Sequence, residues 1–82
     1  MQVTVRYYAG ARAAAGLDQE IIEAPEGGTV ADVTDHLRHL HGAHLGRVLD
    51  AASFLVDEVS AGPQRRLAAG AVLDVLPPFA GG

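Results

Sequence analysis

The sequence predicts a small two-layer α+β domain in which one main helix covers one face of a mixed sheet of four to five strands. Two observations lead to this prediction. Short runs with the period of a strand lie toward both ends of the chain, and an apolar pattern with the period of a helix lies between them. A helix between the second and third strands forms a crossover, so the sheet should mix parallel and antiparallel pairs.

The first strand is expected where Val3, Val5 and Tyr7 alternate with more polar residues. An alanine-rich helical turn at 11–15 follows, closed by Gly16, and a second strand covers 19–24. Successive side chains of a strand point to opposite faces. Therefore one member of the pair Tyr7 and Tyr8 should face the core and the other should face solvent.

The main helix is expected to begin at Thr29, because a hydroxyl residue followed three positions later by Asp32 is typical of a capped helix start. Its buried face should carry Val30, Val33, Leu37 and Leu40. Gly42 should end it. An aspartate in place of either leucine should unfold the domain, because it would bury an unpaired charge.

The second half of the chain gives weaker signals. Residues 44–50 are ambiguous and predict a short helical turn at most, and residues 53–59 predict one strand. Turns are expected at 61–63 and 69–70, with Leu67 tucked in between them, before a final strand at 71–76. We therefore expect a folded domain over residues 1–76 and an extended tail over residues 77–82.

Composition excludes several kinds of function. The chain has 82 residues and a net charge of −4, which argues against nucleic-acid binding. It has no lysine, so it offers no side-chain amine for an isopeptide bond, a Schiff base or a phosphate loop. Without cysteine, it has no disulfide, thiolate metal site or cysteine nucleophile. No apolar run is long enough to span a membrane and no secretory signal is visible, so we expect a cytoplasmic protein.

Four histidines lie close together in the sequence, at His36, His39, His41 and His44. His36 and His39 are three residues apart and in principle share a helix face that binds a metal. We favour structural or surface roles, because no cysteine joins them. No metal or other cofactor is expected on this chain.

Acidic residues also occur in pairs. The pairs Glu20/Glu23 and Asp57/Glu58 suggest carboxylates for acid–base work, but we expect them on a solvated edge of the sheet. No nucleophile or phosphate-binding motif accompanies them. The chain should therefore be non-catalytic alone.

The most informative segment is the tail, residues 77–82. Pro77 and Pro78 stop the last strand, because proline lacks the N–H that a sheet ladder needs. Gly81 and Gly82 have no side chains, so they fit a narrow channel. Six extended residues reach about 20 Å. The tail is therefore suited to present the carboxylate of Gly82 inside another protein, although a frayed terminus is the alternative on composition alone.

The chain resembles the MoaD family, the small sulfur-carrying subunit of molybdopterin synthase, within the MoaD/ThiS superfamily. Residues 73–82 are similar to the family's last strand, its two prolines and its terminal Gly-Gly. Residues 3–12 resemble its first strand, aromatic pair and following arginine, and Gly16 takes the place of its next glycine. Residues 29–33 and 67–70 match its helix start and its last turn. Ala71 and Asp57 depart from the family pattern.

The resemblance implies a β-grasp (ubiquitin-like) fold and a carrier cycle. A MoeB-like enzyme would use ATP in trans to adenylate Gly82, and a sulfur donor would convert it to a thiocarboxylate. Inside a large MoaE-like subunit, in a heterotetramer, the thiocarboxylate would donate sulfur to cyclic pyranopterin monophosphate to form the molybdopterin dithiolene. The resemblance thus assigns Gly81 and Gly82 to the reaction.

Partner contacts are expected from the tail and from aromatic residues near it, since aromatic side chains anchor interfaces. The candidates are Pro77, Pro78, Phe79, Ala80, Leu76, Tyr7 and Tyr8. For Leu76, a core role is as plausible as an interface role. Three other functions stay open: a sulfur carrier for thiazole, cysteine or a secondary metabolite; a ubiquitin-like modifier conjugated through Gly82; and a plain interaction module.

Overall fold

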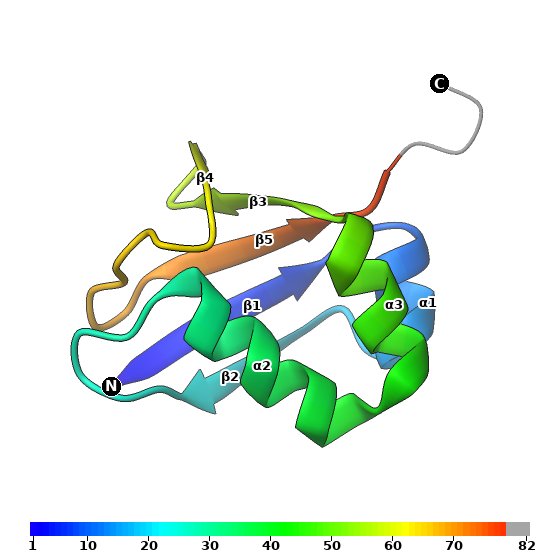
Figure 1. Ribbon diagram of the computed structural model, residues 1–82, viewed down its shortest axis with the longest axis horizontal. Helices are drawn as coiled ribbons and strands as arrows, with labels where there is room; N and C mark the ends of the chain where they lie inside the picture. Colours follow the sequence, from blue (N-terminus) through cyan, green and yellow to red (C-terminus); the bar gives the residue numbers. More distant parts are fainter. Residues whose placement is uncertain (79–82) are drawn as a thin grey trace.

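The structure is a computed structural model that describes residues 1–78. Its elements follow one another as β1 (Gln2–Tyr7), α1 (Gly10–Ala15), β2 (Gln19–Glu23), α2 (Val30–His41), α3 (Ala43–Ala51), β3 (Ser53–Val56), β4 (Val59–Ala61) and β5 (Val72–Leu76). The five strands form one sheet in the order β2-β1-β5-β3-β4. Figure 1 shows α2 and α3 lying over one face of this sheet. The predicted two-layer mixed architecture is therefore confirmed.

The central pair of the sheet, β1 and β5, is parallel, and every other neighbouring pair is antiparallel. Val5 on β1 and Leu73 on β5 are fully buried beneath Leu37 of α2 and Leu45 of α3. Residues of β1 alternate strictly between this core and the other side of the sheet. We call that other side, which the helices do not cover, the open face.

The main helix begins as predicted. The hydroxyl of Thr29 accepts a hydrogen bond from the amide of Asp32, and the carboxylate of Asp32 accepts one from the amide of Thr29. The carbonyls of Arg65 and Pro63 accept from the next two helical amides, those of Val30 and Ala31. The orphan donors of the first turn are thereby satisfied, so the 63–67 segment is fixed to the helix start.

The prediction that Leu40 lies in the core is wrong, because its side chain is 53% exposed. A helix turns about 100° per residue, so Leu40 lies roughly 60° round from Leu37. The buried face of α2 instead carries Thr34 and continues toward His41, whose side chain is 15% exposed. An amphipathic pattern predicts which side of a helix is buried. Which residues at the border of that side are covered depends on the elements that pack against the helix.

Residues 43–51 form a complete helix, α3, where the sequence predicts only a short turn. Leu45 and Leu49 are buried and Val48 is partly buried, so the segment does carry an apolar stripe. Gly46 weakens the sequence signal of this helix, because glycine is unfavourable inside helices. The absence of its side chain admits Arg38 of α2, whose Cγ would lie 3.6 Å from a Cβ at Gly46. A glycine that reads as a helix breaker in the sequence is here a close-packing residue.

The single strand predicted at 53–59 is wrong, because the segment is a hairpin of β3 and β4. Asp57 and Glu58 form its two-residue turn, with φ angles of 48° and 70°. Both values lie in the left-handed region, which glycine and asparagine prefer, so the turn has no strong sequence signal. Asp57 also fixes the turn, because its Oδ1 accepts a 3.0 Å hydrogen bond from the amide of Val72.

Candidate functional site

The candidate site is the end of the sheet from which the chain leaves β5. Because β1 and β5 are parallel, their last residues lie side by side, and the amide of Tyr8 donates a 3.3 Å hydrogen bond to the carbonyl of Val75. Leu76, the last residue of β5, pairs with Ser53 of β3. Pro77 is half-buried and Pro78 is exposed, so the chain leaves the sheet where the prolines were expected to end the strand. Figure 1 shows this end beside the loop that leads into α1.

Four predicted site residues, Phe79, Ala80, Gly81 and Gly82, lie outside the described residues, so their roles stay predictions. The structure does bring the other candidates to one end of the sheet. Tyr8 and Leu76 are half-buried on the open face, next to the start of the tail. Their exposed parts form a small surface beside the start of the tail.

Tyr7 does not belong to this surface. Its side chain is only 1% exposed and lies in the core, as the alternation along β1 requires. Of the two tyrosines, Tyr8 is the one whose side chain can reach a partner. The expectation that one member of the pair faces the core is confirmed, and the assignment of Tyr7 to partner binding is wrong for its side chain.

An ion pair at the centre of the open face was missed by sequence reasoning. The guanidinium of Arg6 donates from Nε to Oδ1 of Asp74 at 2.6 Å and from Nη2 to Oδ2 at 2.9 Å. The hydroxyl of Tyr8 lies 3.5 Å from the same Oδ1. The hydrogen bond to Asp74, aided by its charge, raises the pKa of Arg6 above its ordinary value. The sequence contained one indication of this pair, because Asp74 is the single charged residue in the otherwise apolar strand β5.

A second polar cluster lies under the helices. The hydroxyl of Tyr7 donates to Oε2 of Glu20, and Nε2 of His41 approaches the same oxygen. Glu20 was expected on a solvated edge, but its side chain is only 17% exposed. Burial, followed by the hydrogen bond to Glu20, raises the pKa of Tyr7. A phenol held neutral in this way is a poor nucleophile, so we interpret the cluster as a structural link between β1, β2 and α2.

No metal centre is found among residues 1–78, since no three of their histidine and acidic side chains come together in a way that would hold an ion. His36, His39 and His44 are exposed, and His41 belongs to the Glu20 cluster. None of the helices formed by these residues has both the length and the apolar character that crossing a bilayer requires.

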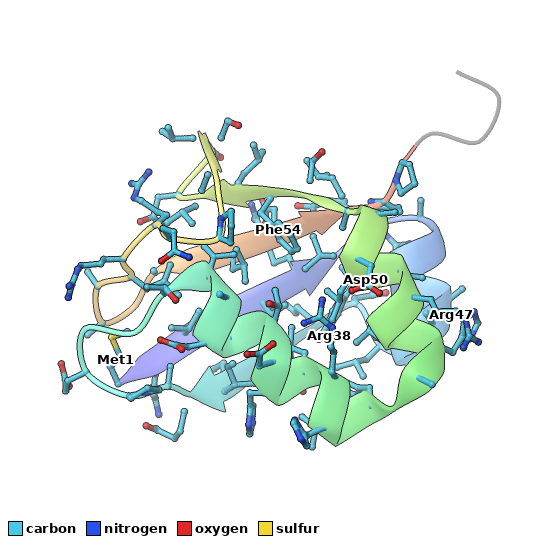
Figure 2. The ribbon with its side chains drawn as sticks, viewed as in Figure 1. Met1, Arg38, Arg47, Asp50 and Phe54 are labelled. Atoms are coloured by element: carbon cyan, nitrogen blue, oxygen red, sulfur yellow. The ribbon has the colours of Figure 1, made fainter. Side chains whose placement is uncertain are left out.

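A groove with a volume of about 530 Å³ lies on the helix side of the sheet. It lies between α2, the end of α3 and the β3–β4 hairpin, with Phe54 in its lining. Its charged groups already satisfy one another, because Arg38 contacts Asp35 at 2.9 Å and Asp50 at 2.7 Å. Figure 2 shows Arg38 and Asp50 close together in this region. The groove offers no converging set of reactive groups.

Comparison with known proteins places this fold. SAMP1 from Haloferax volcanii is 26% identical over 100% of both chains, with a TM-score of 0.88. A putative molybdopterin converting factor subunit 1 from Pyrococcus furiosus is 26% identical, with coverage of 96% of this chain and 99% of that one and a TM-score of 0.81. Subunit 1 in a complex with subunit 2 of the molybdopterin-converting factor from Helicobacter pylori shares the fold at 20% identity, with coverage of 100% of both chains and a TM-score of 0.72.

The predicted β-grasp fold is confirmed by these structures, of which SAMP1 is described as a small archaeal modifier protein. No curated protein matches the sequence closely enough to count as a relative. The model of the ThiS family matches residues 5–82, almost the whole chain and including the terminal Gly-Gly. The chain is therefore a member of the ThiS family of ubiquitin-like proteins.

Proposed function

We propose that this protein is a sulfur carrier that serves as the small subunit of a molybdopterin synthase, with Gly82 as the group that carries sulfur. The observation that carries the proposal is the position of the last strand. β5 lies at the centre of the sheet, between β1 and β3, and ends at Leu76, six residues before Gly82. A strand followed by two prolines fixes the point at which the chain leaves the sheet, which would reduce the ordering cost of inserting the tail into a partner.

The chemistry needs a partner for activation. A carboxylate is a poor electrophile, and ATP in an adenylating enzyme converts it to an acyl-adenylate with release of pyrophosphate. A persulfide then attacks the acyl carbon and AMP leaves. Reduction of the resulting acyl disulfide by a thiol gives the thiocarboxylate. This chain contributes no cysteine and no phosphate-binding loop, so the carboxyl group of Gly82 is its only reacting group in the proposal.

The choice of molybdopterin as the acceptor pathway follows the double proline and the similarity to the Pyrococcus protein. In this proposal the large MoaE-like subunit supplies the acid–base groups and the phosphate pocket, and the thiocarboxylate of Gly82 attacks the pyranopterin. The open face around Tyr8 and Leu76 would dock on that subunit and on the adenylating enzyme.

The test is the intact mass of the protein after incubation with ATP, the adenylating enzyme from the same organism and a persulfide donor. We expect the mass gain of replacing one oxygen by sulfur, and none in a variant that lacks Gly82. Transfer is then followed by adding the large subunit and the pyranopterin, and by assaying dithiolene formation. Absence of the mass gain, with an enzyme that loads another carrier, would rule out the carrier function.

A second function, conjugation to other proteins, is favoured by the similarity to SAMP1, described as a small archaeal modifier protein. The same acyl-adenylate would then react with a lysine of a target. This chain contains no lysine, so it would form single attachments and not chains built on its own side chains. Conjugates of higher mass that disappear when Gly82 is deleted would support this function, and their absence from cells that make the protein would count against it.

A further inference from the structure

The open face contains the Arg6–Asp74 ion pair next to the candidate docking residue Tyr8. Along the sheet, Val72 and Leu76 on β5 and Leu55 on β3 share this face with Asp74, as the strand registers show. Asp74 itself is only 4% exposed, although the helices do not cover this side. Arg6 on the neighbouring strand β1 and Tyr8, which directly follows that strand, both contact the carboxylate of Asp74. The aspartate is therefore already removed from water before any partner binds.

Arg6 is different from Asp74, because its side chain is 36% exposed. Asp74 accepts hydrogen bonds from the Nε–H of Arg6 and from one N–H of Nη2. Three N–H groups of the guanidinium are then not bonded to Asp74. Among residues 1–78, no acceptor within hydrogen-bond distance serves the two N–H groups of Nη1. The Arg6 side chain is partly open to solvent in the free protein. A partner that covers the open face shields these N–H groups from solvent and has to supply an acceptor for them.

This requirement discriminates between partners. A purely apolar partner surface would leave charged donors buried without acceptors, which is costly, whereas a surface with an oxygen opposite Arg6 would satisfy them. The acceptor is expected to be neutral. Asp74 already balances the charge of Arg6, and the chain as a whole carries a net charge of −4, so an additional carboxylate would be repelled.

We propose that the Arg6–Asp74 pair is a specificity determinant of the open face, and that it selects an adenylating enzyme that places a carbonyl oxygen against the outward N–H groups of Arg6. This inference rests on the proposed function. It names the chemistry of the partner surface that lies beside the tail, with Tyr8, Leu55 and Leu76 as the surrounding apolar contacts.

The experiment compares wild-type protein with the double variant Arg6→Leu/Asp74→Leu. Replacing both members of the pair with leucine keeps a similar volume and buries no unpaired charge, so the variant should melt at or above the wild-type temperature. We expect it to bind the adenylating enzyme from the same organism at least tenfold more weakly, as measured by calorimetry. The ratio of the two dissociation constants should change little between low and moderate salt, because the acceptor is neutral.

A matched control is available on the opposite side of the molecule. Arg38→Leu/Asp50→Leu removes another arginine–aspartate pair, with a contact of 2.7 Å, from the helix side, and it should leave the affinity unchanged. A third variant, Arg6→Lys, keeps the charge beside Asp74 but removes the forked donors. It should also weaken binding, and it provides the test should the double variant fail to fold.

Equal affinity of the wild type and the Arg6 variants would overturn the inference, and so would a failure of the wild type to bind the enzyme. If the ratio of the dissociation constants of the double variant and the wild type decreased strongly with added salt, the acceptor on the enzyme would be charged and not neutral. Sulfur loading of Gly82 is read separately by mass. If the wild type is loaded and the variants bind equally well, the proposed function stands and this inference fails. If the wild type binds more tightly than the variants but gains no sulfur, the proposed function fails and the pair remains a specificity determinant.

Discussion

The hydroxyl of Tyr7 donates a hydrogen bond of 2.7 Å to Oε2 of Glu20, which joins the first strand to the second beneath the helices. His41 approaches the same oxygen at 2.5 Å and extends the link to the end of α2. We expect Tyr7→Phe to lower the free energy of unfolding by about 1 kcal/mol, because Glu20 loses a donor in a partly buried site. Urea denaturation would measure this. Tyr8→Phe is the control and should cost less, since its hydroxyl lies 3.5 Å from Asp74.

The same contact predicts a pH dependence. Burial and the hydrogen bond to Glu20 raise the pKa of Tyr7 in the folded protein above its ordinary value of 10.0. The stability that the neutral phenol contributes is therefore fully present below about pH 10 and is lost as the pH rises toward the higher pKa of the folded state. The melting temperature of the wild type should fall above pH 10 more steeply than that of Tyr7→Phe. Superimposable profiles of the two proteins would contradict the prediction.

Two leucines of the main helix should respond in opposite ways to a charge. Leu37 is completely buried, so Leu37→Asp should cost more than about 4 kcal/mol and leave the domain unfolded or nearly so. Leu40 is 53% exposed, so Leu40→Asp should change the free energy of unfolding by less than about 0.5 kcal/mol. Circular dichroism during heating distinguishes the two variants. Unfolding by the Leu40 substitution would show that this residue is buried after all.

The turn of the β3–β4 hairpin offers a stabilising substitution. Glu58 has a φ of 70°, a conformation that is strained for a residue with a side chain and unstrained for glycine. Glu58→Gly should raise the free energy of unfolding by about 0.5–1 kcal/mol. Glu58→Ala removes the same carboxylate but keeps the strain, so it is the control for the loss of charge. Equal effects of the two substitutions in thermal melts would mean that charge, not the backbone, is responsible.

Removal of Gly82 should separate function from stability. Among residues 1–78, the buried core runs from Val3 to Val75. We therefore expect deletion of Gly82 to abolish sulfur loading and to leave the melting temperature unchanged. Intact mass and calorimetry on the same sample give the two readouts. A large decrease in melting temperature would mean that the end of the chain packs on the domain, which is incompatible with a tail that is free to enter a partner.

Local signals in the sequence were sufficient for much of the fold. The capped start at Thr29, the left-handed Gly16 after α1 and the alternation in β1 depend on neighbouring residues, and each was predicted. The β3–β4 hairpin was missed, because the Asp57–Glu58 turn lacks the glycine or asparagine that usually marks such a conformation.

The candidate site was predicted less completely, because its central pair depends on tertiary structure. Arg6 and Asp74 are separated by 68 positions, and only the parallel register of β1 and β5 brings them together. The burial of Glu20 likewise depends on where the end of α2 lies. The tail was recognisable, because its function is expected to reside in the composition of a short contiguous segment.

The parallel pairing of β1 and β5 has a mechanical consequence. A force that pulls the chain at Gln2 and at Leu76 in opposite directions acts along both central strands and slides them past each other. All hydrogen bonds between these strands then bear the load together, whereas an antiparallel hairpin pulled at its two open ends would break them one at a time. We therefore expect the domain to resist extension between its two ends more strongly than its thermodynamic stability alone would indicate.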